Sequence, residues 1–176
     1  MNEIHAKKIT AMAAFTALAL VTFLIENLFP PLMGIPGAKM GLANIFSFAA
    51  LIVYGPIEAF IVVALRTFLG ALFAGNFSAL LYSFTGGVIS MAISCLLLYA
   101  VHPKISVLAV SVFSAVAHNV TQNAVYALIT STLNVFALLP YLCIMGVASG
   151  AIIGVCITVI VKKVPLSVFK RALYNS

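Results

Sequence analysis

The sequence predicts an all-α membrane protein, a compact bundle of six transmembrane helices that forms a single domain. Of the 176 residues, 64% are hydrophobic and 7% are charged, whereas a soluble domain is about half apolar and about a quarter charged. The apolar residues fall into long runs separated by proline, glycine or charge, and the basic residues lie mostly between those runs or at the chain ends. A soluble fold of this composition would expose large apolar patches to water. Most of the surface is therefore expected to face lipid.

Six apolar runs have a length suited to membrane crossing. A helix needs about 20 residues, at about 1.5 Å per residue, to span a hydrocarbon core of about 30 Å. We predict spans at 9–29, 39–54, 57–73, 79–101, 105–130 and 135–161, followed by a basic tail at 162–176. The second and third runs are short for a full crossing, so we expect them to be tilted, broken or shielded by neighbouring helices.

The distribution of lysine and arginine predicts the orientation. An even number of spans places both termini on one side of the membrane. Lys7 and Lys8 precede the first run, Lys104 lies between the fourth and fifth, and further basic residues follow the sixth. The loops on the opposite side contain only Lys39. The positive-inside rule then predicts that both termini are cytoplasmic, in the inner membrane of a bacterium. The net charge of +6 is thus explained by topology rather than by nucleic-acid binding.

The sequence contains no recognisable catalytic or metal-binding pattern. Cys95, Cys143 and Cys156 all lie inside apolar runs without CxxC or Cys/His spacing, which makes a disulfide framework or zinc site unexpected. Aspartate is absent, and the three glutamates are far apart. Walker-type glycine loops and nucleophile elbows are also missing. We expect no catalytic residue, no metal and no cofactor.

The polar residues inside the predicted spans gather in the outer half of the membrane. Arg66 is the most informative, because arginine at mid-membrane is costly and normally faces a protein interior, a carboxylate or a water-filled site. A structural ion pair with Glu26, which lies at a compatible depth, remains an alternative; Glu58 is two turns nearer the cytoplasm on the same helix. The residues that we expect to line a substrate cavity are Lys39, Asn44, Arg66, Asn76, Tyr82, His118, Asn119, Gln122 and Asn123.

The fifth predicted span carries the densest polar cluster. His118 and Gln122 are four residues apart, as are Asn119 and Asn123, so all four project from adjacent strips of one helix face. Any single amide here is equally well explained as a hydrogen bond between helices. The cluster as a whole favours a cavity, and the charges of Lys39 and Arg66 favour an anionic or polar small-molecule substrate.

Two sequence stretches resemble a known family. PGAKMGLANI at 36–45 and LLYSFTGGVIS at 80–90, on either side of the helix with Arg66, are similar to the Gx transporter family, often labelled heptaprenyl diphosphate synthase component I. The resemblance covers nearly the whole chain and extends to the substrate-binding S components of energy-coupling-factor (ECF) transporters. It implies a six-helix fold with a ligand cavity near the outer face. It also implies docking on a transmembrane coupling subunit that is driven by paired ATPase subunits.

The resemblance also bears on the first predicted span. Small residues four apart on this helix are characteristic of the docking surface of S components, and Ala13 and Ala17 have this spacing. Packing within the bundle is the alternative, because small residues let any two membrane helices approach closely.

Three functions follow from these features. The first is a substrate-binding subunit that captures a small anionic or polar molecule from outside. The second is a noncatalytic accessory protein in an isoprenoid, quinone or extracellular electron-transfer pathway. The third, a stand-alone secondary transporter, is disfavoured because no inverted repeat is visible. Synthase activity is not expected, since prenyl diphosphate chemistry needs aspartate clusters that bind magnesium.

Overall fold

The computed structural model describes residues 3–28, 41–75, 77–102 and 104–163. All regular secondary structure in these ranges is helical, which confirms the all-α part of the predicted fold class. The elements are α1 (Glu3–Leu28), α2 (Asn44–Val53), α3 (Pro56–Ala74), α4 (Phe77–Ala100), α5 (Val107–Thr130), the 3₁₀ helix η2 (Leu133–Leu138) and α6 (Leu139–Lys163). Their order matches the six predicted runs.

Four segments are long and apolar enough to cross a membrane, so the chain is a multi-pass membrane protein. They are Lys8–Leu28, Pro56–Ala74, Phe77–Ala100 and Leu133–Lys163. The fifth helix, α5, has 24 residues and is long enough to span the hydrocarbon core, but its polar cluster makes it less apolar than these four.

The second helix is shorter than predicted. The run at 39–54 was expected to be one span, but α2 has only 10 residues, equivalent to about 15 Å, or half of the hydrocarbon core. Residues 39–40 lie outside the described ranges, and Gly41 adopts a positive φ of 66° in the turn before the helix. Six consecutive residues of α2, positions 47–52, are buried. Because they cover the whole helix circumference, α2 is shielded from lipid by its neighbours, which is how a short helix is tolerated at membrane depth.

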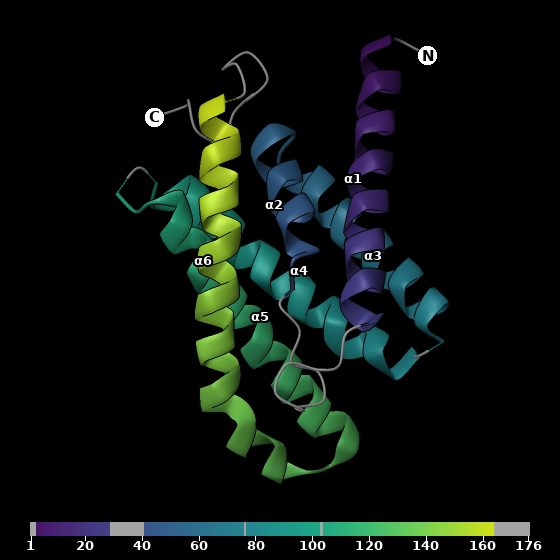
Figure 1. Cartoon of the computed structure of the whole chain (residues 1–176), viewed down its shortest axis with the longest axis vertical. Helices are drawn as coiled ribbons and strands as arrows, with labels where there is room; N and C mark the ends of the chain where they lie inside the picture. Colours follow the sequence, from purple (N-terminus) through teal and green to yellow (C-terminus); the bar gives the residue numbers. More distant parts are fainter. Residues whose placement is uncertain (1–2, 29–40, 76, 103, 164–176) are drawn as a thin grey trace.

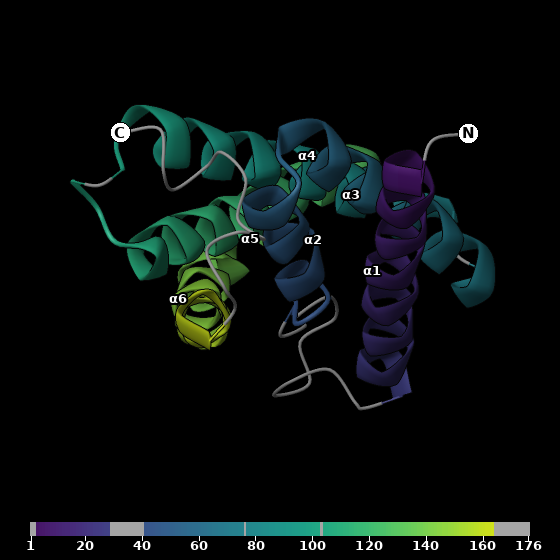
Figure 2. The ribbon, with the colours of Figure 1, turned by 90° about the horizontal axis from the view of Figure 1, so that it is seen from above.

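The helices form two rows. In Figures 1 and 2, α1, α2 and α6 lie in one row, and α3, α4 and α5 lie behind them with a pronounced tilt. The hydrophobic core lies between the rows, where Leu51 of α2 is fully buried and Val110 of α5 and Ile153 of α6 are almost fully buried. The short α2 therefore lies between α1 and α6 and packs against α1, α3, α4 and α6.

Three glycines allow α6 to pack very closely against α5. Gly146, Gly150 and Gly154 are spaced four residues apart, so they form one face of α6. A Cβ atom on Gly150 would lie 2.6 Å from the Cα of Val112, and one on Gly154 would lie 2.8 Å from the Cα of Leu108. Such stripes of small residues permit backbone-to-backbone contact between membrane helices. This contact sets how α5 presents its polar face to the interior.

The two ends of the chain that the structure describes lie at the same end of the helical bundle (Figure 1). The first residues of α1 and the last residues of α6 lie at the same end, at the top of Figure 1. An ion pair between Lys8 and Glu58 joins the second turn of α1 to the first turn of α3 at this end. The arrangement agrees with an even number of passes. That this end is cytoplasmic remains a prediction from the positive-inside rule.

Cysteine labelling in intact cells should test this orientation. In a background without Cys95, Cys143 and Cys156, we expect a membrane-impermeant maleimide to label a Gly37→Cys variant and not a Lys104→Cys variant. The reason is that Lys104 belongs to the lysine-rich side, whereas position 37 belongs to the loop on the other side. Permeabilised cells provide the control, since both variants should then react. Labelling of Lys104→Cys alone in intact cells would reverse the orientation.

Candidate functional site

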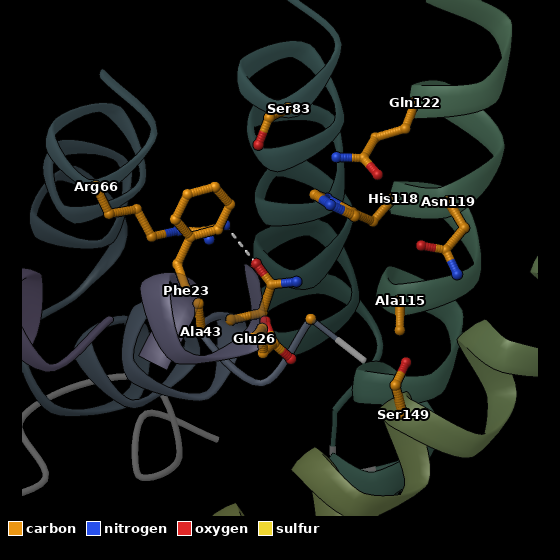
Figure 3. Close-up of a pocket in the computed structure, with 12 residues that line it drawn as sticks. Phe23, Glu26, Ala43, Arg66, Ser83, Ala115, His118, Asn119, Gln122 and Ser149 are labelled. Atoms are coloured by element: carbon orange, nitrogen blue, oxygen red, sulfur yellow. Dashed lines mark hydrogen bonds between the residues drawn. The ribbon is translucent and has the colours of Figure 1, made fainter. Parts of the chain in front are cut away.

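A polar cavity of about 40 Å³ lies inside the bundle. All six α-helices, or the turns that precede them, contribute to its wall (Figure 3). The lining residues are Phe23, Glu26, Gly41, Ala43, Asn44, Arg66, Ser83, Ala115, His118, Asn119, Gln122 and Ser149. One water molecule needs about 10–15 Å³ of such space. The cavity therefore has room for only a few atoms in this conformation of the protein.

Arg66 provides the positive charge of the cavity. Its side chain is only 6% exposed, and Nη2 donates a hydrogen bond to Oδ1 of Asn44 at 2.5 Å, the bond drawn in Figure 3. The buried Nε has no hydrogen-bond partner among the described residues. The guanidinium thus retains hydrogen-bonding capacity beyond its contact with Asn44.

Glu26 faces the same cavity as Arg66 and is close enough to interact electrostatically with it. Its Oε1 also accepts a hydrogen bond of 2.9 Å from the backbone N–H of Leu42. This bond ties the last turns of α1 to the turn before α2. Glu26 and Arg66, which we expected at compatible depths, therefore line one cavity. Glu58, by contrast, forms its ion pair with Lys8.

The polar face of α5 reaches the cavity through three side chains. His118 is 9% exposed, and its Nδ1 has no hydrogen-bond partner among the described residues. Nδ2 of Asn119 donates a 2.9 Å hydrogen bond to the carbonyl of Leu142 on α6, so this residue both joins two helices and lines the cavity. Gln122 extends the polar wall by one further helical turn.

Two adjacent glycines of α4 make room for these polar groups. A Cβ atom on Gly86 would lie 2.7 Å from Cγ of Gln122 and 3.3 Å from Nδ1 of His118. A Cβ atom on Gly87 would lie 2.8 Å from Cγ1 of Val63 and 3.7 Å from Nη2 of Arg66. The glycine pair at 86–87, in the stretch SFTGG, was not among the predicted site residues, although its place near the polar residues of the same predicted span was visible in the sequence.

The structure brings together five of the nine predicted lining residues. These are Asn44, Arg66, His118, Asn119 and Gln122. Tyr82 is half-buried and packs edge to face against Tyr126, with ring centroids 5.8 Å apart. Asn123 is buried beside the cavity-lining stretch without being part of the wall, and its Nδ2 has no hydrogen-bond partner among the described residues. Lys39 and Asn76 lie outside the described residues.

Several wall residues were not predicted as binding residues. From the sequence, Glu26 is expected as an ion-pair partner of Arg66 and not as a binding residue, and Ser83 and Ser149 are not expected in the site. The described residues contain no group of three His, Cys, Asp or Glu that could hold a metal ion. What the wall offers is one buried guanidinium, amides, an imidazole and a carboxylate, a set suited to binding a small charged or polar molecule.

Comparison with known proteins identifies the family. The family model for heptaprenyl diphosphate synthase component I matches residues 15–160, a range that contains every residue of the cavity wall. No curated protein and no solved structure matches the chain. The resemblance to the Gx transporter family, which often carries this label, is confirmed. The chain therefore belongs to the heptaprenyl diphosphate synthase component I family.

Proposed function

We propose that the chain is the substrate-binding membrane subunit of an ECF-type transporter, which captures a small anionic or polar molecule at the outer face of the membrane. The observation that carries the proposal is the cavity around Arg66, to which all six α-helices contribute. A charged side chain inside a membrane protein is expensive and usually marks a functional site. Here the surrounding wall adds hydrogen-bonding groups that a purely structural charge does not need.

The chemistry of the wall favours an anion. A guanidinium binds carboxylates and phosphates through paired, charge-assisted hydrogen bonds. Arg66 has donors that its bond to Asn44 does not use, and Gln122 lies in the same wall. Glu26 balances the charge of Arg66 while the site is empty of ligand. An entering anion would then compete with Glu26 and Asn44 for the guanidinium.

Mass spectrometry of the protein purified in mild detergent is the direct test. We expect a small anion bound to the chain, and complexes whose masses include a coupling subunit and two ATPase subunits. A chain that carries an isoprenoid or quinone and associates with enzymes of those pathways would instead support the accessory role.

The surface of α1 supports docking on a partner. Ala13 and Ala17 are both exposed on the outside of the bundle, so packing inside the bundle does not account for them. Small residues four apart allow a second membrane helix to approach closely. The sequence contains no nucleotide-binding motif, and energy for transport would therefore have to come from partner subunits.

Bulky substitutions on this surface should prevent assembly. In a double variant, Ala13→Leu with Ala17→Leu, we expect the amount of coupling subunit that co-purifies with the chain to fall at least tenfold, because the partner helix can no longer approach closely. Binding of an anion to the isolated chain should not change. Ala148→Leu, on the exposed surface of α6, is the matched control. Unchanged assembly of the double variant would remove α1 as the docking surface.

We also propose that the chain has no prenyl-transfer activity of its own. The sequence lacks aspartate, and within the described part of the chain Glu26 binds the Leu42 backbone and Glu58 pairs with Lys8. With magnesium, an allylic diphosphate and labelled isopentenyl diphosphate, we expect the purified chain to produce no more polyprenyl product than a protein-free blank. Magnesium-dependent elongation by the chain alone would contradict this proposal.

A further inference from the structure

A second cavity, of about 30 Å³, adjoins the polar one. Its wall consists of Asn44, Phe48, Val63, Ser90, Met91, Ser94, Ser111, Ser114, Ala115 and Ile153. Asn44 and Ala115 belong to both walls. The other residues lie about one to three helical turns from the polar cavity, toward the end of the bundle that contains the chain termini. The two cavities are therefore stacked along the bundle. We call them the polar cavity and the lower cavity, where lower means farther from the predicted outer face of the membrane.

The lower cavity offers few donors to a ligand, although four serines line it. The hydroxyl of Ser90 donates to the Gly87 carbonyl at 3.0 Å, and the hydroxyl of Ser114 donates to the Val110 carbonyl at 2.8 Å. Ser94 lies within hydrogen-bond distance of the Ser114 hydroxyl, at 2.7 Å. A hydroxyl whose hydrogen is already donated can only accept a further bond. Three of the four serine hydroxyls are thus engaged, and the described wall of the lower cavity contains no charged side chain, so an anionic group is poorly accommodated here.

The remaining wall of the lower cavity is apolar. Phe48, Val63, Met91 and Ile153 come from four different helices, and each is less than one tenth exposed or belongs to the buried core. Transfer of apolar groups from water to such surroundings is favourable. The lower cavity thus suits hydrocarbon, whereas the polar cavity suits a charged group.

The hydrogen bond between Arg66 and Asn44 lies at the boundary of the two cavities. Asn44 belongs to both walls, and its Oδ1 accepts from the guanidinium. A carboxylate or phosphate that binds Arg66 competes for the same donor, and a charged acceptor forms the stronger bond. Capture of the anion would release the side chain of Asn44, one of the two residues that belong to both walls.

From this stacking we propose that the substrate is an amphipathic anion, with a carboxylate or phosphate at Arg66 and an unbranched apolar chain of two or three carbon atoms that passes Asn44 into the lower cavity. The chain length follows from the volume, since about 10–15 Å³ accommodates one water-sized group. The inference rests on the proposed function and specifies its substrate class.

A homologous series of anions tests the inference. Binding of acetate, propionate, butyrate, pentanoate and hexanoate to the purified chain in lipid nanodiscs can be measured by calorimetry at constant ionic strength. Each methylene that enters the lower cavity should tighten binding about fourfold, so butyrate should bind about fifteenfold more tightly than acetate. Hexanoate should show no further gain. Straight-chain alcohols of the same lengths control for partition into lipid. Comparison of the affinities of alkyl phosphates and carboxylates shows which head group Arg66 prefers.

Variants that fill the lower cavity provide the second arm. Ser90→Leu and Ser114→Leu add bulk from α4 and α5 respectively, so either variant that folds is informative. Each should bind acetate like the unmodified chain and lose the gain with chain length. Ala92→Leu adds the same bulk on the exposed face of α4 and should keep that gain.

The outcomes separate this inference from the proposed function. Anion binding that depends on Arg66 but does not tighten with chain length would overturn the apolar extension and leave the proposed function in place. A gain that persists in the filled variants would also overturn the extension. Absence of any anion binding that depends on Arg66 would overturn both.

Discussion

Replacing Arg66 with methionine should abolish anion binding. The Arg66→Met variant keeps an apolar side chain in place of the aliphatic part of Arg66, and it removes the one arginine or lysine among the described residues of the cavity wall. Hydrogen bonds to charged groups contribute about 1.5–3 kcal/mol each, and about 1.4 kcal/mol corresponds to a tenfold change in affinity. Loss of two such bonds should weaken binding at least about a hundredfold. Calorimetric titration with acetate and butyrate measures the change, and circular dichroism checks that the helices remain folded.

Two carboxylate variants separate binding from structure. Glu58→Gln removes a charge from the same helix, α3, but Glu58 pairs with Lys8 outside the cavity, so anion affinity should stay unchanged. Glu26→Gln removes a carboxylate that shares the cavity with Arg66, and it should strengthen anion binding by removing a competing negative charge. If Arg66→Met instead bound anions normally and lost as much stability as Glu26→Gln, the two residues would be a structural ion pair.

The helices could be predicted from composition, but the length of α2 could not. Apolar runs of about 20 residues indicate spans because lipid is the only solvent that suits them, and this argument locates α1, α3, α4 and α6 to within a few residues. It does not distinguish a helix facing lipid from a helix buried in protein, since both are apolar. The segment that contains α2 is apolar because it is buried in protein. The structure shows this burial at positions 47–52, and it also shows that α2 is only 10 residues long.

The sequence predicts the membrane level of the site residues, but it predicts only in part which of them face the cavity. The predicted topology assigns each polar residue a level in the membrane, and Asn44, Arg66 and His118, which it places in the outer half, line one cavity. Which way a side chain faces depends on where neighbouring helices pack. Gln122 and Asn123 are adjacent in the sequence, yet about 100° separates them around a helix, and only Gln122 reaches the wall. Sequence periodicity alone could not choose between them.

The packing of α6 on α5 should be the interface most sensitive to a small substitution. In a Gly150→Ala variant, the new Cβ would meet the Cα of Val112 at 2.6 Å and the carbonyl oxygen of Ser111 at 2.9 Å. Both atoms belong to the α5 backbone, so they cannot rotate away, and the two helices must separate. Overpacking of this kind typically costs about 1–3 kcal/mol. We expect a loss near the upper end of that range in unfolding titrations with a denaturing detergent.

Gly70→Ala is the matched control, since it makes the same change in the middle of α3. Its Cβ would also be too close to a neighbour, at 2.9 Å, but that neighbour is the ring of Phe23, a side chain that can turn. Because the Phe23 ring can rotate away from the new Cβ, the free energy of unfolding should fall by less than about 1 kcal/mol, within the range typical of tolerated core changes. Because Ser111 and Ala115 of α5 contribute to the cavity walls, Gly150→Ala should also weaken butyrate binding. Equal losses of stability in the two variants would show that close backbone contact does not hold α5 in place.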